Sequence, residues 1–142
     1  LSRPALANID QAIIINSCKE PDFSFNLLDR FLLLIEHESI TPVIVLTKTD
    51  LMSEDELNEL KINMKYYEPF YKVIYTSTVT NEGSEEFKNI FKDKVSMFAG
   101  QTGAGKSSLL NILDTSLNLK TGILDLKKVQ NMILIARERL YH

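Results

Sequence analysis

One octapeptide of this sequence has the residue types and the spacing needed to hold a phosphate group. Residues 100–107 read GQTGAGKS and match the pattern G-x-x-x-x-G-K-[ST] at every position. Glycines let the backbone curl so that successive amide groups point at phosphate oxygens, and a helix that starts here presents its positive end to the same anion. We predict that Lys106 reaches the terminal phosphates, that the Ser107 hydroxyl binds Mg²⁺, and that both take part in catalysis.

The whole loop is predicted to contact the nucleotide phosphates. Its residues are Gly100, Gln101, Thr102, Gly103, Ala104, Gly105, Lys106, Ser107 and Ser108. The alternative is a chance glycine turn that holds no ligand. The buried-type run KVSMFA before the loop and the expected helix after it argue against that alternative, because the motif requires a strand, a loop and a helix in this order.

A second short motif could read a nucleotide base. Residues 47–50 read TKTD and have the form [NT]-K-x-D, which GTPases use for guanine. The Asp50 carboxylate can accept hydrogen bonds from the ring N1–H and the exocyclic amine of guanine, whereas adenine presents a lone pair there. The stem of Lys48 is expected along the base plane, and Thr47 is expected to tie this turn to the phosphate loop. Thr49, the remaining residue of the motif, is also predicted to contact the nucleotide. Taken alone, the tetrapeptide fits equally well an ordinary loop that follows a strand and caps a helix.

A third segment, around Ser77, follows the run KVIYT at residues 72–76. In GTPases a serine-containing loop at this place touches the guanine carbonyl through a backbone N–H, so Ser77 is a candidate base contact. A plain turn after a strand is the alternative. The order of the motifs is Asp50, Ser77, then Lys106, which reverses the usual order. Since a site needs proximity in space rather than order along the chain, we interpret this as a circular permutation.

The elements that must position these motifs alternate along the chain. Short apolar, β-branched runs predict strands, and apolar residues at helical spacing predict helices between them. Strands are expected at residues 12–15, 42–46, 72–76 and 94–99, and helices after Ser24, from Ser53 to about Met64, at residues 84–91, after Lys106, and at residues 124–141. The alternation predicts an α/β fold with a doubly wound, mostly parallel sheet of the P-loop type, with ligands at the carboxyl ends of its strands.

Composition limits the class of protein. The chain has 142 residues, of which 44% are hydrophobic and 25% charged, with a net charge of −3. It can form one compact core, and it is not basic enough to hold nucleic acid by itself. Cys18 is the single cysteine, and with His37 and His142 it fits no zinc pattern, so a buried apolar role is expected. With no apolar run of membrane-spanning length and no signal peptide, we expect a cytoplasmic protein without membrane contact. We also expect the protein to be a monomer.

At this point the chain resembles the RsgA-type (YloQ-type) GTPases of small ribosomal subunit biogenesis. The likeness covers about residues 3 to 121. The segments that carry it are ANIDQA at 7–12, PDFS at 21–24, LDRFL at 28–32, TKTDL at 47–51 and FAGQTGAGKSSLLN at 98–111. The resemblance implies a permuted GTP-binding domain with GTP or GDP and Mg²⁺, flanked in the family by an OB-fold and a zinc-binding helical part. It also implies binding to the small (30S) ribosomal subunit and its rRNA, and GTP hydrolysis that the ribosome stimulates.

The sequence departs from that family after the phosphate-loop helix. No aspartate has a glycine three residues later, so the Asp-x-x-Gly motif that senses the γ-phosphate is absent, as are the zinc ligands. We therefore predict an incomplete permuted domain at residues 1–121 and a C-terminal helix at residues 122–142 that resembles the family's zinc-binding helical region. Our hypothesis is that missing segments meet near residues 121–123, and the alternative is a real deletion.

Three other functions stay open from the sequence. The protein could be an ATP-using P-loop enzyme, a regulatory module that holds nucleotide without turning it over, or an α/β domain without nucleotide. Asp50 separates the first from a GTPase, because it should favour guanine over adenine. Phosphate release, measured with and without small ribosomal subunits, separates the second.

Overall fold

The computed structural model of the chain describes residues 8–101, 103–106, 108–109, 111, 119–125 and 132–138. Within these residues, strands form one sheet in the order β3-β2-β1-β4-β6-β5. The strands are β1 (Gln11–Ser17), β2 (Thr41–Thr47), β3 (Lys72–Tyr75), β4 (Val95–Gly100), β5 (Leu119–Asp125) and β6 (Met132–Glu138). The first four strands pair with one another in parallel, so the predicted mostly parallel α/β sheet is confirmed.

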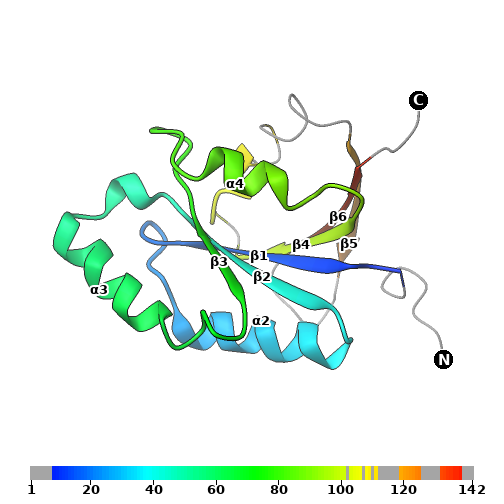
Figure 1. Cartoon of the computed structure of the whole chain (residues 1–142), viewed down its shortest axis with the longest axis horizontal. Coiled ribbons are helices and arrows are strands. Elements are labelled where there is room, and N and C mark those ends of the chain that lie inside the picture. The colour runs from blue at the N-terminus through cyan, green and yellow to red at the C-terminus, as the bar shows by residue number, and fades with distance from the viewer. Residues whose placement is uncertain are drawn as a thin grey trace.

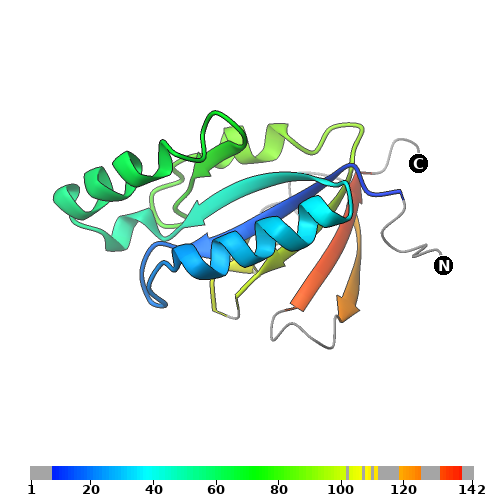
Figure 2. The same cartoon turned by 90° about the horizontal axis from the view of Figure 1, so that it is seen from below.

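Helices cover both faces of the sheet. On one face lie α2 (Phe25–His37) and α3 (Glu54–Met64), and on the other lies α4 (Ser84–Asn89), as Figures 1 and 2 show. The described residues Lys106, Ser108, Leu109 and Asn111 are helical and follow the phosphate loop. This arrangement is the doubly wound architecture that the alternation of elements predicts.

The core explains why the middle of β1, residues 12–15, is an unbroken apolar run. Every residue of β1 is buried, because both of its faces are covered. Ile14 faces the cluster that contains Leu28 of α2, whereas Ile13 and Ile15 face the cluster that contains Phe87 of α4. The central strand therefore joins two apolar cores and fixes the sheet on which the site is built.

Two predicted helix starts are confirmed by their hydrogen bonds. Ser24 caps α2, and its hydroxyl accepts from the Leu27 N–H at 3.1 Å. Ser53 and Glu56 form a capping box at the start of α3, in which each side chain accepts from the backbone N–H of the other residue. The capping box begins after the short 3-10 helix Thr49–Leu51, so α3 starts close behind the TKTD turn.

The C-terminal part differs from our expectation. The helix predicted for residues 122–142, and more narrowly for 124–141, is wrong, since β5 and β6 occupy residues 119–125 and 132–138. β6 pairs antiparallel with β4, and β5 pairs antiparallel with β6. An unbroken run such as MILIA fits a buried strand as well as a helix, and the free edge of β4 decides between them. β5 also includes residues 121–123, near which we placed the junction of missing segments, and that hypothesis stays a prediction. Among the described residues, no helix has the length and apolar character to cross a membrane.

Candidate nucleotide-binding site

Parallel strand register brings the two predicted motifs to one edge of the sheet. Ser17, the last residue of β1, pairs with Thr47 of β2, and Ile15 pairs with Gly100 of β4. The three strands thus end side by side with their carboxyl ends at the same edge. Because the TKTD turn follows β2 and the glycine loop follows β4, the two turns emerge next to each other although residues 51–99 separate them along the chain.

Two side chains of the base-reading turn hydrogen-bond directly to the phosphate loop. The Thr47 hydroxyl donates to the Ala104 carbonyl and lies 3.3 Å from the carbonyl of Asn16. The Lys48 ammonium donates to the Gly103 carbonyl at 2.9 Å. The expectation that Thr47 ties the two loops together is therefore confirmed. Both motifs therefore lie at the same edge of the sheet, where they contact each other directly.

The glycines at the ends of the phosphate loop are required by close approach. A Cβ added to Gly100 would lie 2.4 Å from the Ile15 carbonyl oxygen, so no side chain fits there. Gly105 has φ of 98°, in the left-handed region that favours glycine, and its Cα faces Thr47. The loop can therefore pass close to the neighbouring strand and turn, as a phosphate-binding loop requires, and its role as a phosphate cradle stays a prediction.

Lys106 carries a charge into this cradle. Its side chain is only 8% exposed, and its ammonium donates to the carbonyls of Gly100 at 2.6 Å and Gln101 at 3.3 Å. Burial lowers the pKa of Lys106, because the charged form loses solvation. Among the residues that the structure describes, no carboxylate bonds this ammonium. A buried cation held by neutral carbonyls fits a site for an anionic ligand. Two other loop residues predicted to contact phosphate or metal, Thr102 and Ser107, lie outside the described residues.

Asp50 lies at the surface and is held at one oxygen. The Ser77 hydroxyl donates to Asp50 Oδ1 at 2.7 Å, so the structure brings these two predicted base contacts together. The Ser77 N–H, which we predicted to face the base, donates within its own loop to the Glu82 carbonyl at 3.1 Å. The Ser77 hydroxyl, rather than its backbone N–H, is therefore the group that contacts Asp50.

Two further contacts of the turn escaped the sequence analysis. Thr49 donates its hydroxyl to Glu82 Oε1 at 2.5 Å, and Lys48 donates to the Glu20 carbonyl at 2.5 Å. Glu20 lies in the loop after β1, and Glu82 lies in the loop after β3. No motif marks either residue, since each acts from a loop whose path only the tertiary structure sets. Both loops leave the same sheet edge, which is the one general signal that points to them.

Cys18 lies beside this edge as a buried, protonated thiol. Burial, together with the negative charges of Glu82 and Asp50, raises its pKa to about 12. The side chain is 2% exposed, which confirms the expected buried role at a strand end. Within the described part of the chain, no cluster of histidine, cysteine or acidic residues could hold a metal ion.

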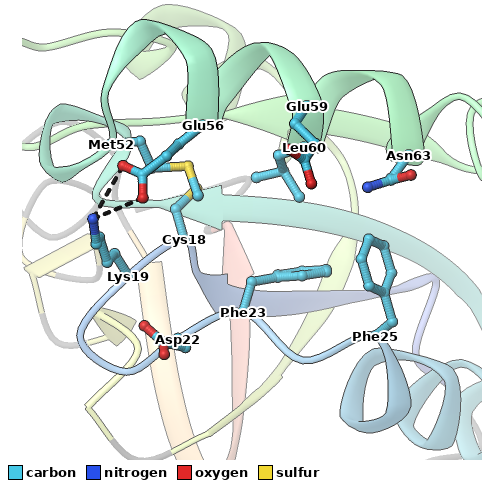
Figure 3. A pocket seen from close by; sticks show the side chains of 10 residues that line it. All are labelled: Cys18, Lys19, Asp22, Phe23, Phe25, Met52, Glu56, Glu59, Leu60 and Asn63. Carbon is cyan, nitrogen blue, oxygen red and sulfur yellow. Dashed lines mark hydrogen bonds and ion pairs between the residues drawn. The ribbon is translucent and has the colours of Figure 1, made fainter.

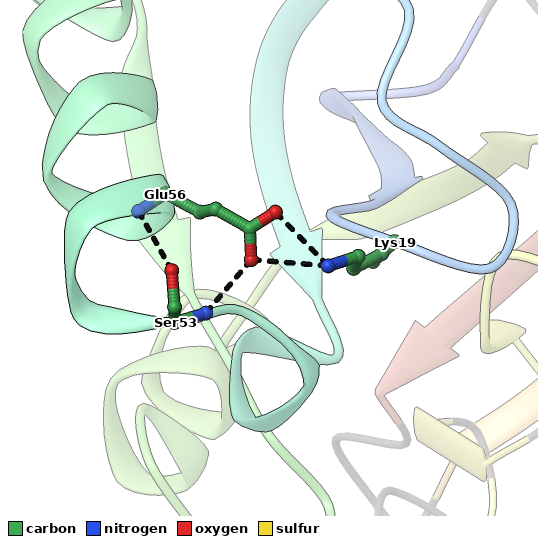
Figure 4. A network of polar contacts seen from close by, with 3 residues as sticks. All are labelled: Lys19, Ser53 and Glu56. Carbon is green, nitrogen blue, oxygen red and sulfur yellow. Dashed lines mark hydrogen bonds and ion pairs between the residues drawn. The ribbon is translucent and has the colours of Figure 1, made fainter.

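A cavity of about 470 Å³ lies next to the site but is distinct from it. It opens between the loop after β1 and α3, and Figure 3 shows Phe23, Phe25 and Leu60 along its apolar wall. At its mouth, the Lys19 ammonium lies 2.9 Å from Glu56 Oε2 and joins the capping box, as Figure 4 shows. None of the phosphate-loop residues that the structure describes lines this cavity. The Lys19–Glu56 ion pair links the loop after β1 to the start of α3.

Comparison with known proteins relates this geometry to one family. The family model described as RsgA GTPase matches residues 1–130. The chain is 51% identical over 122 residues to "Small ribosomal subunit biogenesis GTPase RsgA 2" of Oceanobacillus iheyensis, covering 85% of this chain and 42% of that protein. It is 50% identical over 123 residues to the small ribosomal subunit biogenesis GTPase RsgA of Geobacillus thermodenitrificans, covering 86% of this chain and 42% of that protein.

Solved structures show the same likeness. The crystal structure of YjeQ from Thermotoga maritima matches with a TM-score of 0.73 and 36% identity, over 84% of this chain and 45% of that one. YloQ, described as a circularly permuted GTPase, matches with a TM-score of 0.69 and 38% identity, over 80% of this chain and 40% of that one. The chain spans about two fifths of the length of the curated relatives it matches.

Proposed function

Because the chain belongs to the RsgA GTPase family, we propose that it binds GTP and GDP and forms part of an enzyme that hydrolyses GTP. The observation that carries this proposal is the pair of hydrogen bonds from Thr47 and Lys48 to the carbonyls of Ala104 and Gly103. These bonds hold the base-reading turn and the phosphate loop in direct contact. A nucleotide has the same two ends, a base and a phosphate chain, so one ligand can engage both motifs.

The phosphate end relies on Lys106 and the loop amides. Lys106 donates to two backbone carbonyls, and a phosphate can replace them as a stronger, charged acceptor. Ser107 would hold Mg²⁺, which neutralises charge that develops between the β- and γ-phosphates. The contribution of the chain to hydrolysis is therefore positioning and electrostatic stabilisation rather than covalent chemistry. The chain contains no Asp-x-x-Gly, so no residue here is assigned to position the attacking water.

The base end relies on Asp50. Ser77 holds one of its oxygens at 2.7 Å, which limits how the carboxylate can turn. A carboxylate held in this way can accept hydrogen bonds from both the N1–H and the amine of guanine. In adenine it would face the lone pair of the ring nitrogen, which repels it. Mismatch at a site that hydrogen-bonds its ligand typically costs several kcal/mol, or about 10⁴-fold in favourable cases.

We further propose that the protein acts in maturation of the small ribosomal subunit in the cytoplasm, as the names of its relatives suggest. The described domain is not basic, with a chain net charge of −3, so rRNA contacts should come mainly from other parts of the protein. Ribosome-stimulated turnover and a zinc site elsewhere in the protein follow from the family resemblance. Binding as a monomer is part of the same proposal.

Titration calorimetry of the purified chain with GTP, GDP and ATP tests the proposal. We expect GTP and GDP to bind and ATP to bind at least about tenfold more weakly, which corresponds to about 1.4 kcal/mol. A preference for ATP would overturn the assignment. Phosphate release with and without small ribosomal subunits then tests turnover. Nucleotide binding without any stimulated release would favour a regulatory module instead.

A further inference from the structure

Glu82, in the loop after β3, contacts both segments that hold Asp50. We propose that Glu82 is a positioning residue that sets the preference of this site for guanine, because it fixes the turn that carries the Asp50 carboxylate. The inference rests on the proposed function, since it concerns how the same site reads its base. Four observations support it: two hydrogen bonds, one glycine contact and one arrangement of charge.

The first contact involves the residue directly before Asp50. The Thr49 hydroxyl donates to Glu82 Oε1 at 2.5 Å and lies 3.2 Å from the Thr76 carbonyl. Thr49 is buried, so its hydroxyl has little access to water. The preceding residue, Lys48, has φ of 62°, in the left-handed region that residues with a Cβ rarely adopt. Such a turn persists only where surrounding contacts hold it, and Glu82 supplies one of them.

The second contact involves the residue that bonds Asp50. The Ser77 N–H donates to the Glu82 carbonyl at 3.1 Å. The Ser77 hydroxyl donates to Asp50 Oδ1 and accepts from the amides of Val79 and Thr80 at 3.2 and 3.1 Å. The loop from Ser77 to Glu82 is therefore closed on itself, and its closure orients the hydroxyl that holds the Asp50 carboxylate.

The residue after Glu82 anchors this loop to the sheet. Gly83 has φ of 71°, and a Cβ added to it would lie 2.0 Å from the Tyr75 carbonyl oxygen. Only glycine fits where the chain passes so close to the end of β3. The close packing of Gly83 against β3 consequently fixes the backbone position of the preceding residue, Glu82. From this position the Glu82 carboxylate accepts the hydrogen bond of the Thr49 hydroxyl.

The charge of Glu82 also favours guanine. The Thr49 hydroxyl bonds Glu82, and Asp50 directly follows Thr49 in the chain, so both carboxylates lie at the base-reading turn. Both also raise the pKa of the nearby Cys18 thiol. Guanine presents the donors N1–H and an amine on the edge that Asp50 reads, whereas adenine presents a lone pair. A second carboxylate nearby therefore strengthens the preference for the donor edge.

The test compares GDP with inosine diphosphate, which keeps N1–H and lacks only the exocyclic amine. The ratio of their dissociation constants for the 142-residue chain reports the amine contact and cancels uniform losses of affinity. We expect Glu82→Ala to reduce this preference for GDP about fivefold, as for the loss of one bond to a charged group. Glu82→Gln keeps an acceptor oxygen and should restore the ratio to within about twofold of wild type.

Two further variants make the result decisive. Glu86→Ala removes an equal charge from α4, where Glu86 pairs with Lys72 at 3.4 Å, and it should leave the ratio unchanged. Thr49→Val removes the partner of Glu82 and should lower the ratio by the same factor as Glu82→Ala, which tests the bond even if Glu82→Ala fails to fold. An unchanged ratio in Thr49→Val, or an equal loss in Glu86→Ala, overturns the inference. If wild type shows no preference for GDP over ADP, the proposed function itself fails.

Discussion

Replacing Thr47 by valine tests the contact on which the site depends. Valine has nearly the same shape but lacks the hydroxyl that donates to the Ala104 carbonyl and lies 3.3 Å from the Asn16 carbonyl. Thr47 is 4% exposed, so water cannot readily replace the lost donor. Leaving a buried carbonyl without a partner costs about 1 to 3 kcal/mol. The β-propensity of valine returns only a few tenths of a kcal/mol.

We therefore expect Thr47→Val to lower the free energy of unfolding by about 1 to 2 kcal/mol. For a domain of this size, the melting temperature should fall by roughly 3 to 8 °C. The phosphate loop loses its tie to the base-reading turn, so the affinity for GDP should fall by up to about tenfold. Circular dichroism melts with and without GDP, together with calorimetric titration of GDP, measure both effects.

Thr41→Val is the matched control, because it makes the same chemical change at an exposed position on the same strand. It should leave both the melting temperature and the GDP affinity close to wild type. If Thr47→Val also matches wild type in both measurements, the two loops are not coupled through this hydroxyl. The reasoning that assembles one site from two distant motifs would then be refuted.

Three other changes follow from the same geometry. Asp50→Ala should weaken GDP binding at least about tenfold and leave ADP binding unchanged, as competition titrations would show. Lys106→Met should abolish nucleotide binding without destabilising the free protein. Because burial lowers the pKa of Lys106 in the folded state, wild type should gain stability relative to this variant as pH rises from the lowered pKa toward 10.5, measured by urea denaturation at several pH values. The Cys18 thiol, with its pKa raised to about 12, should resist a thiol reagent at pH 8 until the protein is unfolded.

The parts of the site that lie in continuous motifs were predictable. Each motif carries its own chemistry: glycines for the curled loop, Lys106 for charge and Asp50 for the base. The strands before the motifs were predictable too, because a two-sided buried strand such as β1 has a distinctive run of apolar residues. The parallel direction of β1 to β4 follows from their alternation with helices, whereas the order of the strands in the sheet came from the tertiary structure.

The two C-terminal strands show where sequence reasoning failed. Residues 132–136 read MILIA, and a short apolar run satisfies the pattern of a buried helix and of a strand equally. The choice depends on the open edge of β4, to which β6 pairs from Val95↔Arg137 to Ala99↔Ile133. That edge exists only after the sheet has formed, so no local pattern could reveal it.

By itself, the sequence displayed a full match to the phosphate-loop pattern, a TKTD turn of the form that reads guanine, the strands that lead into them and the permuted order of these motifs. Those features depend on residue type and on short spacing, which a linear chain already displays. Only the tertiary structure decided that Thr47 meets Ala104, that Ser77 turns its hydroxyl to Asp50, and that Glu82 closes on Thr49. Such contacts join residues from separate loops, and their geometry is set by strand register and packing rather than by any pattern along the chain.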